Sequence, residues 1–175
     1  MAKLYPSHIP TSSLQKVLLA AGSAAVAILN PLRGDMVATF GETTAQLILP
    51  RIKNRMAEDH VGRRILREQP RFTNATIDIA RLRSLSDGTL GREYVRFLDK
   101  LQTTPDERPP VQFVDSVDVV NVMQRYRETH DLFHTVLEMP TSMLGEVAVK
   151  WFEGIQFGLP MCVLGGIFGA VRLQP

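Results

Sequence analysis

The stretch His130-Asp131-Leu132-Phe133-His134, followed by Met139-Pro140-Thr141-Ser142 and then Glu146, decides how this chain folds around its most reactive side chains. His130 and His134 are four positions apart, so on an α-helix both imidazoles leave the same face and can share one metal ion. Glu146 would lie about 18 Å beyond His134 if one straight helix ran through both. Pro140 stops that helix directly before two good N-cap residues. The sequence therefore predicts a helix-turn-helix pair, with Glu146 in the first turns of the second helix and opposite the two histidines.

These residues form a plausible set of metal ligands. Two neutral imidazoles and two carboxylates balance the charge of a divalent cation, so the predicted ligands are His130, Asp131, His134 and Glu146. Asp131 lies about 100° around the helix from His130, so it is either a fourth ligand or a partner that orients an imidazole. Mixed nitrogen and oxygen ligands favour zinc, with iron or manganese as alternatives. Three protein ligands would leave a position open for substrate or water, whereas four would suit a structural ion.

Zinc peptidases offer one comparison for this pattern. They place a catalytic Glu between two His at the same spacing, and a later helix supplies a third ligand. Here Asp131 occupies the region between the histidines. Its side chain is one methylene shorter and would hold a water molecule differently, so peptide hydrolysis is the weaker interpretation.

The remaining sequence predicts an all-α protein. Its 175 residues are enough for one domain, over residues 1–175, that buries a core without disulfides. Apolar residues recur at helical spacing, and no stretch alternates as a strand would. The expected helices end or begin at Pro, Gly and capping residues. They comprise a first helix that is capped within residues 11–13 and has its apolar run over 17–29, two segments within 35–58 that meet near Pro50, a segment between Asp59 and Pro70, 76–82, 90–101, a long helix capped by Asp115, 147–155 and the apolar run 161–171.

Charge and cysteine content restrict the partners. Residues 51–100 carry 12 Lys and Arg against 7 Asp and Glu, whereas residues 111–175 carry 4 against 7. Solvated helix faces explain the basic region best, and an anionic lipid surface or an acidic substrate is the alternative. Nucleic acid is not expected, because acidic residues dilute the arginines and few aromatic residues lie among them. Cys162 is the only cysteine, which excludes an intramolecular disulfide.

Three segments carry a family resemblance. The stretches 4–12, 90–94 and 130–162 resemble the coenzyme Q (ubiquinone) biosynthesis protein 4 family, and the similarity spans essentially the whole chain. The metal motif of that family is complete here in His130, Asp131, His134 and Glu146. Members begin with a mitochondrial transit peptide and continue past the position of Arg172, so we expect this domain to be incomplete at its C-terminal end.

The resemblance implies a function in ubiquinone synthesis. It implies zinc binding and a matrix-side, peripheral location on the mitochondrial inner membrane, where the protein organises other coenzyme Q biosynthesis proteins into a complex. It also implies removal of the C1 carboxylate from a polyprenylated hydroxybenzoate, a carbon-carbon lyase reaction. The ion would hold a substrate oxygen while Asp131 or Glu146 delivers the proton that replaces CO₂. An oxidative reaction that leaves a hydroxyl group stays open, as does a homo-oligomer.

A second function class is compatible with the same residues. The chain could be a non-catalytic scaffold that uses a structural ion and binds a prenyl lipid while presenting it to partner enzymes. The apolar run 161–171 could contribute to such a lipid groove, to a partner contact or to the core.

Overall fold

The chain folds entirely into helices and their connections. In the computed structural model, which describes residues 2–173, no β-strand is present, as the all-α prediction requires. The described elements are, in chain order, α1 (Ser13–Leu29), α2 (Gly34–Thr44), η1 (Ala45–Leu47), α3 (Leu49–Glu58), α4 (His60–Glu68), α5 (Ile79–Arg83), α6 (Leu90–Leu101), η2 (Pro105–Glu107), α7 (Val117–Val136), α8 (Met143–Phe157) and α9 (Pro160–Val171).

Several helix starts follow from local capping chemistry. Ser12 caps α1 through a capping box, in which its hydroxyl accepts from the backbone N–H of Gln15 while the Gln15 side chain accepts from the backbone N–H of Ser12. Asp59 caps α4 by accepting from two backbone N–H groups of the first turn. Pro50 lies at the start of α3, where its missing N–H leaves no helical bond unmade. These boundaries were predictable from the sequence.

Two predicted boundaries were wrong. The helix expected over 76–82 begins only at Ile79, because Asp78 caps it by accepting from the N–H of Arg81. Asp115 does not cap α7: the N-cap is Ser116, which makes no side-chain cap hydrogen bond. The Asp115 carboxylate instead pairs with Lys16 from α1. Asp115, which the local sequence pattern predicted as a helix cap, therefore forms an ion pair with a residue 99 positions away in the sequence.

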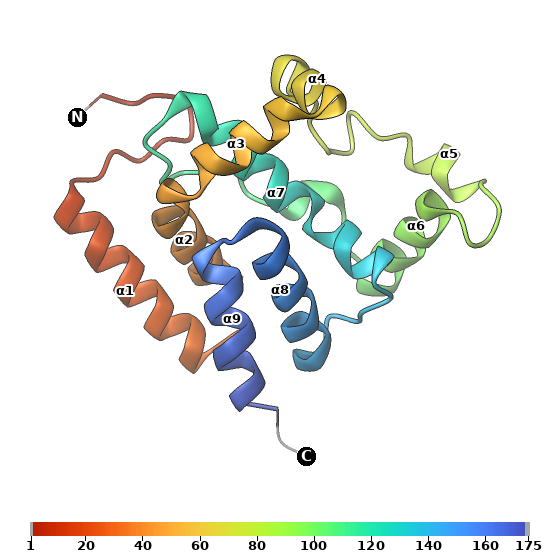
Figure 1. Cartoon of the computed structure of the whole chain (residues 1–175). Coiled ribbons are helices and arrows are strands. Elements are labelled where there is room, and N and C mark those ends of the chain that lie inside the picture. The colour runs from red at the N-terminus through yellow and green to blue at the C-terminus, as the bar shows by residue number, and fades with distance from the viewer. Residues whose placement is uncertain (1, 174–175) are drawn as a thin grey trace.

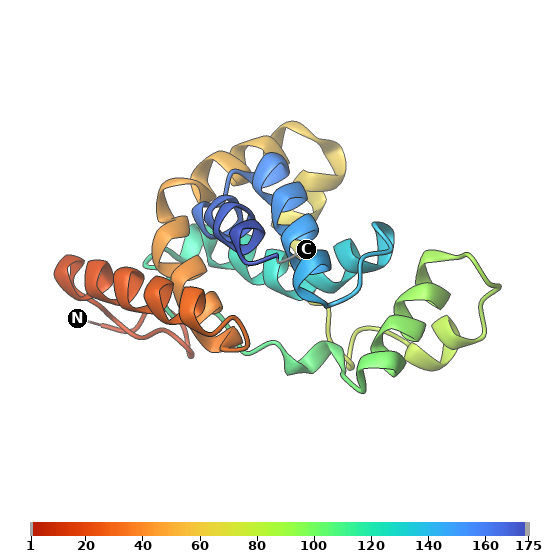
Figure 2. The same cartoon turned by 90° about the horizontal axis from the view of Figure 1, so that it is seen from below.

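The long helix α7 runs through the middle of the molecule (Figure 1). The main core lies where α2, α3 and α9 meet it, around Leu49, Val122, Met123 and Cys162. The helices α8 and α9 form an antiparallel pair that packs against α7 and α2. On the other side, α5 and α6 project from the body, with α6 lying against α7 (Figure 2). The central helix therefore contacts both the core and the projecting pair.

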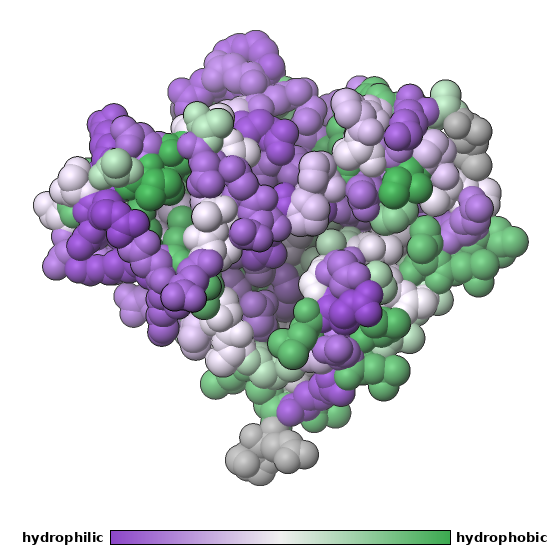
Figure 3. All heavy atoms as spheres, turned by 180° about the vertical axis from the view of Figure 1, so that it is seen from behind, coloured by the Kyte–Doolittle hydropathy of each residue, from purple (hydrophilic) through white to green (hydrophobic). Residues whose placement is uncertain are grey.

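The last described helix keeps part of its apolar surface exposed. Met161 and Cys162 are buried, whereas Phe168 is 46% and Val171 80% exposed. Apolar side chains gather over the lower part of the molecule around the end of α9 (Figure 3). Within residues 2–173, no helix combines the length and the apolar character needed to cross a bilayer.

Candidate metal centre

The turn between α7 and α8 has the predicted form. α7 ends at Val136, and Ser142 caps α8 by accepting from the backbone N–H of Gly145. Gly145 is required by close packing, because a Cβ at this position would lie 1.9 Å from the carbonyl oxygen of Pro140. The turn therefore folds α8 back on α7 and places Glu146 in the first turn of α8.

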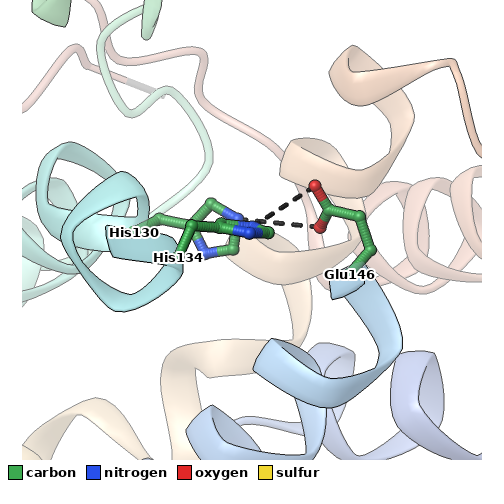
Figure 4. Close-up of side chains that lie close together, drawn as sticks. All are labelled: His130, His134 and Glu146. Atoms are coloured by element: carbon green, nitrogen blue, oxygen red, sulfur yellow. Dashed lines mark ion pairs between the residues drawn. The ribbon is translucent and has the colours of Figure 1, made fainter. Parts of the chain in front are cut away.

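Three side chains converge between the two helices. His130 and His134 project from α7 toward Glu146 on α8 (Figure 4). The Nε2 atom of His134 lies 3.4 Å from Oε1 of Glu146, and the Nε2 atom of His130 lies 3.8 Å from Oε2. One ligand atom from each residue lies within 4.8 Å of the other two. The structure thus brings together three of the four predicted ligands.

Hydrogen bonds fix both imidazoles in the tautomer that a metal requires. Nδ1 of His134 lies 3.0 Å from the carbonyl oxygen of Met139, which can only accept, so Nδ1 carries the proton. Nδ1 of His130 lies 2.6 Å from Oε1 of Glu153, a carboxylate that also accepts. In their neutral forms, both imidazoles therefore present an Nε2 lone pair to the space beside Glu146. His134 Nε2 is buried without a hydrogen-bond partner, which is costly unless another group binds there.

The electrostatics of the centre keep its carboxylate ionised. Burial raises the pKa of Glu146, but the two neighbouring imidazoles and Lys150 outweigh this effect and hold the pKa well below its ordinary value. Burial lowers the pKa of His134, but the Glu146 carboxylate, the Met139 carbonyl and Asp131 together raise it by more. Because Glu146 and the imidazoles each stabilise the charged form of the other, a cation between them is favoured, whether it is a proton or a metal ion.

Asp131 lies outside this group of three. Its Oδ1 atom pairs with the guanidinium of Arg108, from the segment that precedes α7. The Asp131 side chain is 12% exposed and that of Arg108 is 39% exposed. Neither of the two roles considered for Asp131 is seen among the described residues: it is not one of the three convergent ligands, and its carboxylate pairs with Arg108 and not with an imidazole.

Sequence reasoning missed the residues beneath the histidines. Glu153 is completely buried on α8 and, besides His130, accepts from the hydroxyl of Tyr126 at 2.8 Å and from Nζ of Lys150 at 2.9 Å. Burial raises the pKa of Glu153, but Lys150 and His130 lower it to about 2. A sequence signal did exist: the charged residues 146, 150 and 153 share one face of α8 at helical spacing. That face opposes a stripe on α7 formed by Tyr126 and the two histidines.

The donor set fits a divalent ion. Zinc bonds of about 2.0 to 2.1 Å in a tetrahedral shell place neighbouring donors about 3.3 Å apart, close to the 3.4 and 3.8 Å separations here. Two histidines and one carboxylate occur in catalytic zinc sites and also in non-haem iron sites. His130, His134 and Glu146 could therefore hold zinc or iron and leave coordination positions open.

Several known proteins are similar to this chain in sequence. The family model described as "Coenzyme Q (ubiquinone) biosynthesis protein Coq4" matches residues 5–175. The Xenopus laevis protein named "Ubiquinone biosynthesis protein COQ4 homolog, mitochondrial" is 57% identical over 98% of this chain and 60% of its own length. The human protein of the same name is 55% identical over 97% of this chain and 64% of its own length. The chain thus spans less than two thirds of these relatives.

A solved structure supports the same fold. A crystal structure of a protein assigned to ubiquinone biosynthesis, from Nostoc punctiforme, aligns with a TM-score of 0.65 and 21% identity. The alignment covers 93% of this chain and 73% of that protein. At this identity the likeness establishes the fold alone, whereas the family model and the relatives establish common descent. The chain belongs to the Coq4 family of coenzyme Q (ubiquinone) biosynthesis proteins.

Proposed function

We propose that this chain binds one divalent metal ion through His130, His134 and Glu146 and uses it in ubiquinone biosynthesis. The reaction is removal of the C1 carboxylate from a 4-hydroxy-3-methoxy-5-polyprenylbenzoate type of intermediate, a carbon-carbon lyase reaction. The observation that carries the proposal is the buried, unpartnered Nε2 of His134, which faces a carboxylate oxygen 3.4 Å away. Family membership supplies the pathway.

Charge balance at the centre favours an anionic substrate. Glu146 contributes one negative charge, whereas Asp131 is neutralised by Arg108 and Glu153 by Lys150. A divalent ion held there would keep one positive charge uncompensated. When bound, such an ion supplies a Lewis acid with open positions for a carboxylate or phenolate oxygen. The 38% exposure of the Glu146 side chain leaves the centre reachable from outside, as a catalytic site requires.

The carboxylates around the centre have different proposed roles in ligation and proton transfer. Glu146 is held ionised by the two histidines, which suits a ligand and not an acid. Asp131 is the candidate general acid: its carboxylate first takes up a proton from solvent and then delivers it to the ring carbon as the bond to the substrate carboxylate breaks and CO₂ leaves. The electron pair of that bond stays on the ring carbon and takes up the proton. Arg108 then stabilises the Asp131 carboxylate that remains.

Attachment to a membrane and to partner proteins belongs to the same proposal. The relatives are named as mitochondrial, and we infer a peripheral position on the matrix side of the inner membrane for this chain. Exposed apolar side chains on α1 and α9, including Leu18 and Phe168, support contact with a lipid surface or with other coenzyme Q biosynthesis proteins. They also suit a polyprenylated substrate that is delivered from the bilayer.

A decarboxylation assay tests the catalytic proposal. Purified protein loaded in turn with zinc, iron or manganese is given a polyprenylated hydroxybenzoate labelled at the C1 carboxylate, with and without O₂. We expect labelled CO₂ with at least one of these metals, and the dependence on O₂ separates simple from oxidative decarboxylation. Absence of CO₂ under all of these conditions would overturn the enzymatic function.

The scaffold function remains the second candidate because of one observation. The three ligands join α7 to α8 across their turn, so an ion bound there would also fasten the two helices. A protein that binds the metal, retains prenyl lipid and releases no CO₂ would support this function over catalysis.

A further inference from the structure

The residues beneath the metal centre form a connected polar layer within the helix bundle. Glu153 is 0% exposed, and the Lys150 side chain that pairs with it is 13% exposed. Oε2 of Glu153 accepts from Tyr126 at 2.8 Å and from Lys150 at 2.9 Å. Its other oxygen, Oε1, lies 2.6 Å from Nδ1 of His130. The layer thus ends directly on one of the candidate ligands.

A contribution to folding stability does not by itself explain a buried pair of Glu153 and Lys150. Taking a carboxylate and an ammonium out of water carries a large desolvation cost, and apolar residues of similar size often give equal or greater stability. An ion pair between a fully buried carboxylate and a largely buried ammonium therefore suggests another role for these charges.

A comparison with two other buried carboxylates indicates what that role is. Glu42 and Glu128 each accept from backbone N–H groups, Glu42 from the segment before α7 and Glu128 from Phe72. These two carboxylates therefore hold the backbone of connecting segments against the helices. Within residues 2–173, every hydrogen bond of the Glu153 carboxylate goes to a side chain. The Glu153 carboxylate therefore orients neighbouring side chains and does not hold a backbone segment in place.

We propose that Glu153, held in place by Lys150 and Tyr126, is a positioning residue for the metal centre: it fixes the tautomer and ring orientation of His130 and makes Nε2 a stronger ligand. This inference rests on the proposed metal centre and adds residues that the family motif does not contain. The geometry is the carboxylate–histidine–metal arrangement, in which a carboxylate accepts a hydrogen bond from the imidazole N–H remote from the ion. Lys150 supplies the charge that keeps the carboxylate ionised without leaving the buried layer negative. Tyr126 holds Oε2, which leaves Oε1 facing His130.

The test compares metal affinity in three variants. Glu153→Gln removes the negative charge but leaves Lys150 without its partner, which by itself can destabilise the fold. The double variant Glu153→Gln/Lys150→Met removes both charges and keeps similar side-chain volumes. Glu128→Gln is the matched control, since it neutralises a buried carboxylate on α7 that pairs with Arg71 and contacts none of the three ligands.

Affinity for Zn²⁺ is measured by competition with a chromophoric chelator, and the visible absorption of the Co²⁺-loaded protein reports the ligand geometry. We expect the single and double variants to bind Zn²⁺ roughly 10- to 100-fold more weakly than the parent chain, with an altered Co²⁺ spectrum. Glu128→Gln should keep the parent affinity and spectrum.

The outcomes separate this inference from the proposed function. A parent chain that binds neither ion would overturn the metal centre itself. A parent chain that binds Zn²⁺, together with a folded double variant of equal affinity and unchanged Co²⁺ spectrum, would overturn only the positioning role. Weaker binding in Glu128→Gln, equal to that of the Glu153 variants, would show a general loss of packing and would also overturn that role.

Discussion

Replacing His134 by Ala should abolish the stabilisation that zinc gives to this chain. A ligand that binds only the folded state at a free concentration of about 100 Kd stabilises it by about 2.7 kcal/mol. For a chain of this size, each kcal/mol raises the melting temperature Tm by roughly 2 to 4 °C, so zinc should raise Tm by about 5 to 10 °C. The substitution removes a buried donor that faces Glu146 at 3.4 Å and leaves two ligands. The zinc-dependent rise in Tm should then fall to about 1 °C or less.

A second histidine provides the control for loss of packing. His8 is 2% exposed, and its ring bonds to Asp115 and to the backbone N–H of Leu4, away from the metal centre. His134→Ala and His8→Ala should each lower the unfolding free energy of the metal-free protein by about 1 to 3 kcal/mol, and its Tm should fall accordingly. Only His134→Ala should lose the zinc response.

Differential scanning fluorimetry of the parent chain and both variants, each with and without Zn²⁺, measures these effects. A zinc-dependent rise in Tm that is equal in His134→Ala and the parent chain would refute the assignment of His134 as a ligand. Loss of the response in His8→Ala would show that the response reports folding in general.

Three further substitutions test separate parts of the structure. Asp131→Asn should keep the metal content but lower kcat for CO₂ release by about 10² to 10⁴-fold if Asp131 is the general acid; an unchanged kcat would exclude that role. Gly145→Ala should cost about 1 to 3 kcal/mol in thermal unfolding, because its Cβ would overlap the Pro140 carbonyl, and an unchanged Tm would contradict the close packing of the turn. Burial raises the pKa of Asp115, but Lys16 and the neighbouring hydrogen bonds lower it by more, so its net pKa is below normal. Its stabilisation is therefore present above about pH 4 and is lost as the pH falls through the lower, folded-state value. Asp115→Asn should remove this part of the acid sensitivity, about 1 kcal/mol or less for a partly exposed pair, as measured by urea unfolding from pH 7 to pH 3.

The convergence of His130, His134 and Glu146 could be predicted because its determinants are local. The spacing of His130 and His134 follows from helical geometry. Ser142 determines where α8 begins, and Pro140 lies in the turn that follows the end of α7 at Val136. The resulting turn is short, so Glu146 has few places to lie other than opposite the histidines. Local chemistry of this kind also set the caps of α1 and α4.

The parts that could not be predicted depend on contacts distant in the sequence. Asp131 pairs with Arg108, which approaches from a connecting segment whose path no local pattern specifies. Asp115 likewise pairs with Lys16, a residue of α1 that is distant in the sequence. Glu153 lies two helical turns after Glu146, a spacing common on any amphipathic helix. Its contact with His130 becomes apparent only once α8 is known to run antiparallel to α7.

Metal content is the most direct test of the central claim. The purified parent chain and a double variant, His130→Ala/His134→Ala, are dialysed against zinc-containing buffer, freed of loosely bound ions by gel filtration and analysed for metals by mass spectrometry. Three convergent donors with bare Nε2 atoms predict about one divalent ion per parent chain and almost none in the double variant. Equal metal content in the two proteins, or none in the parent chain, would contradict a metal centre at His130, His134 and Glu146.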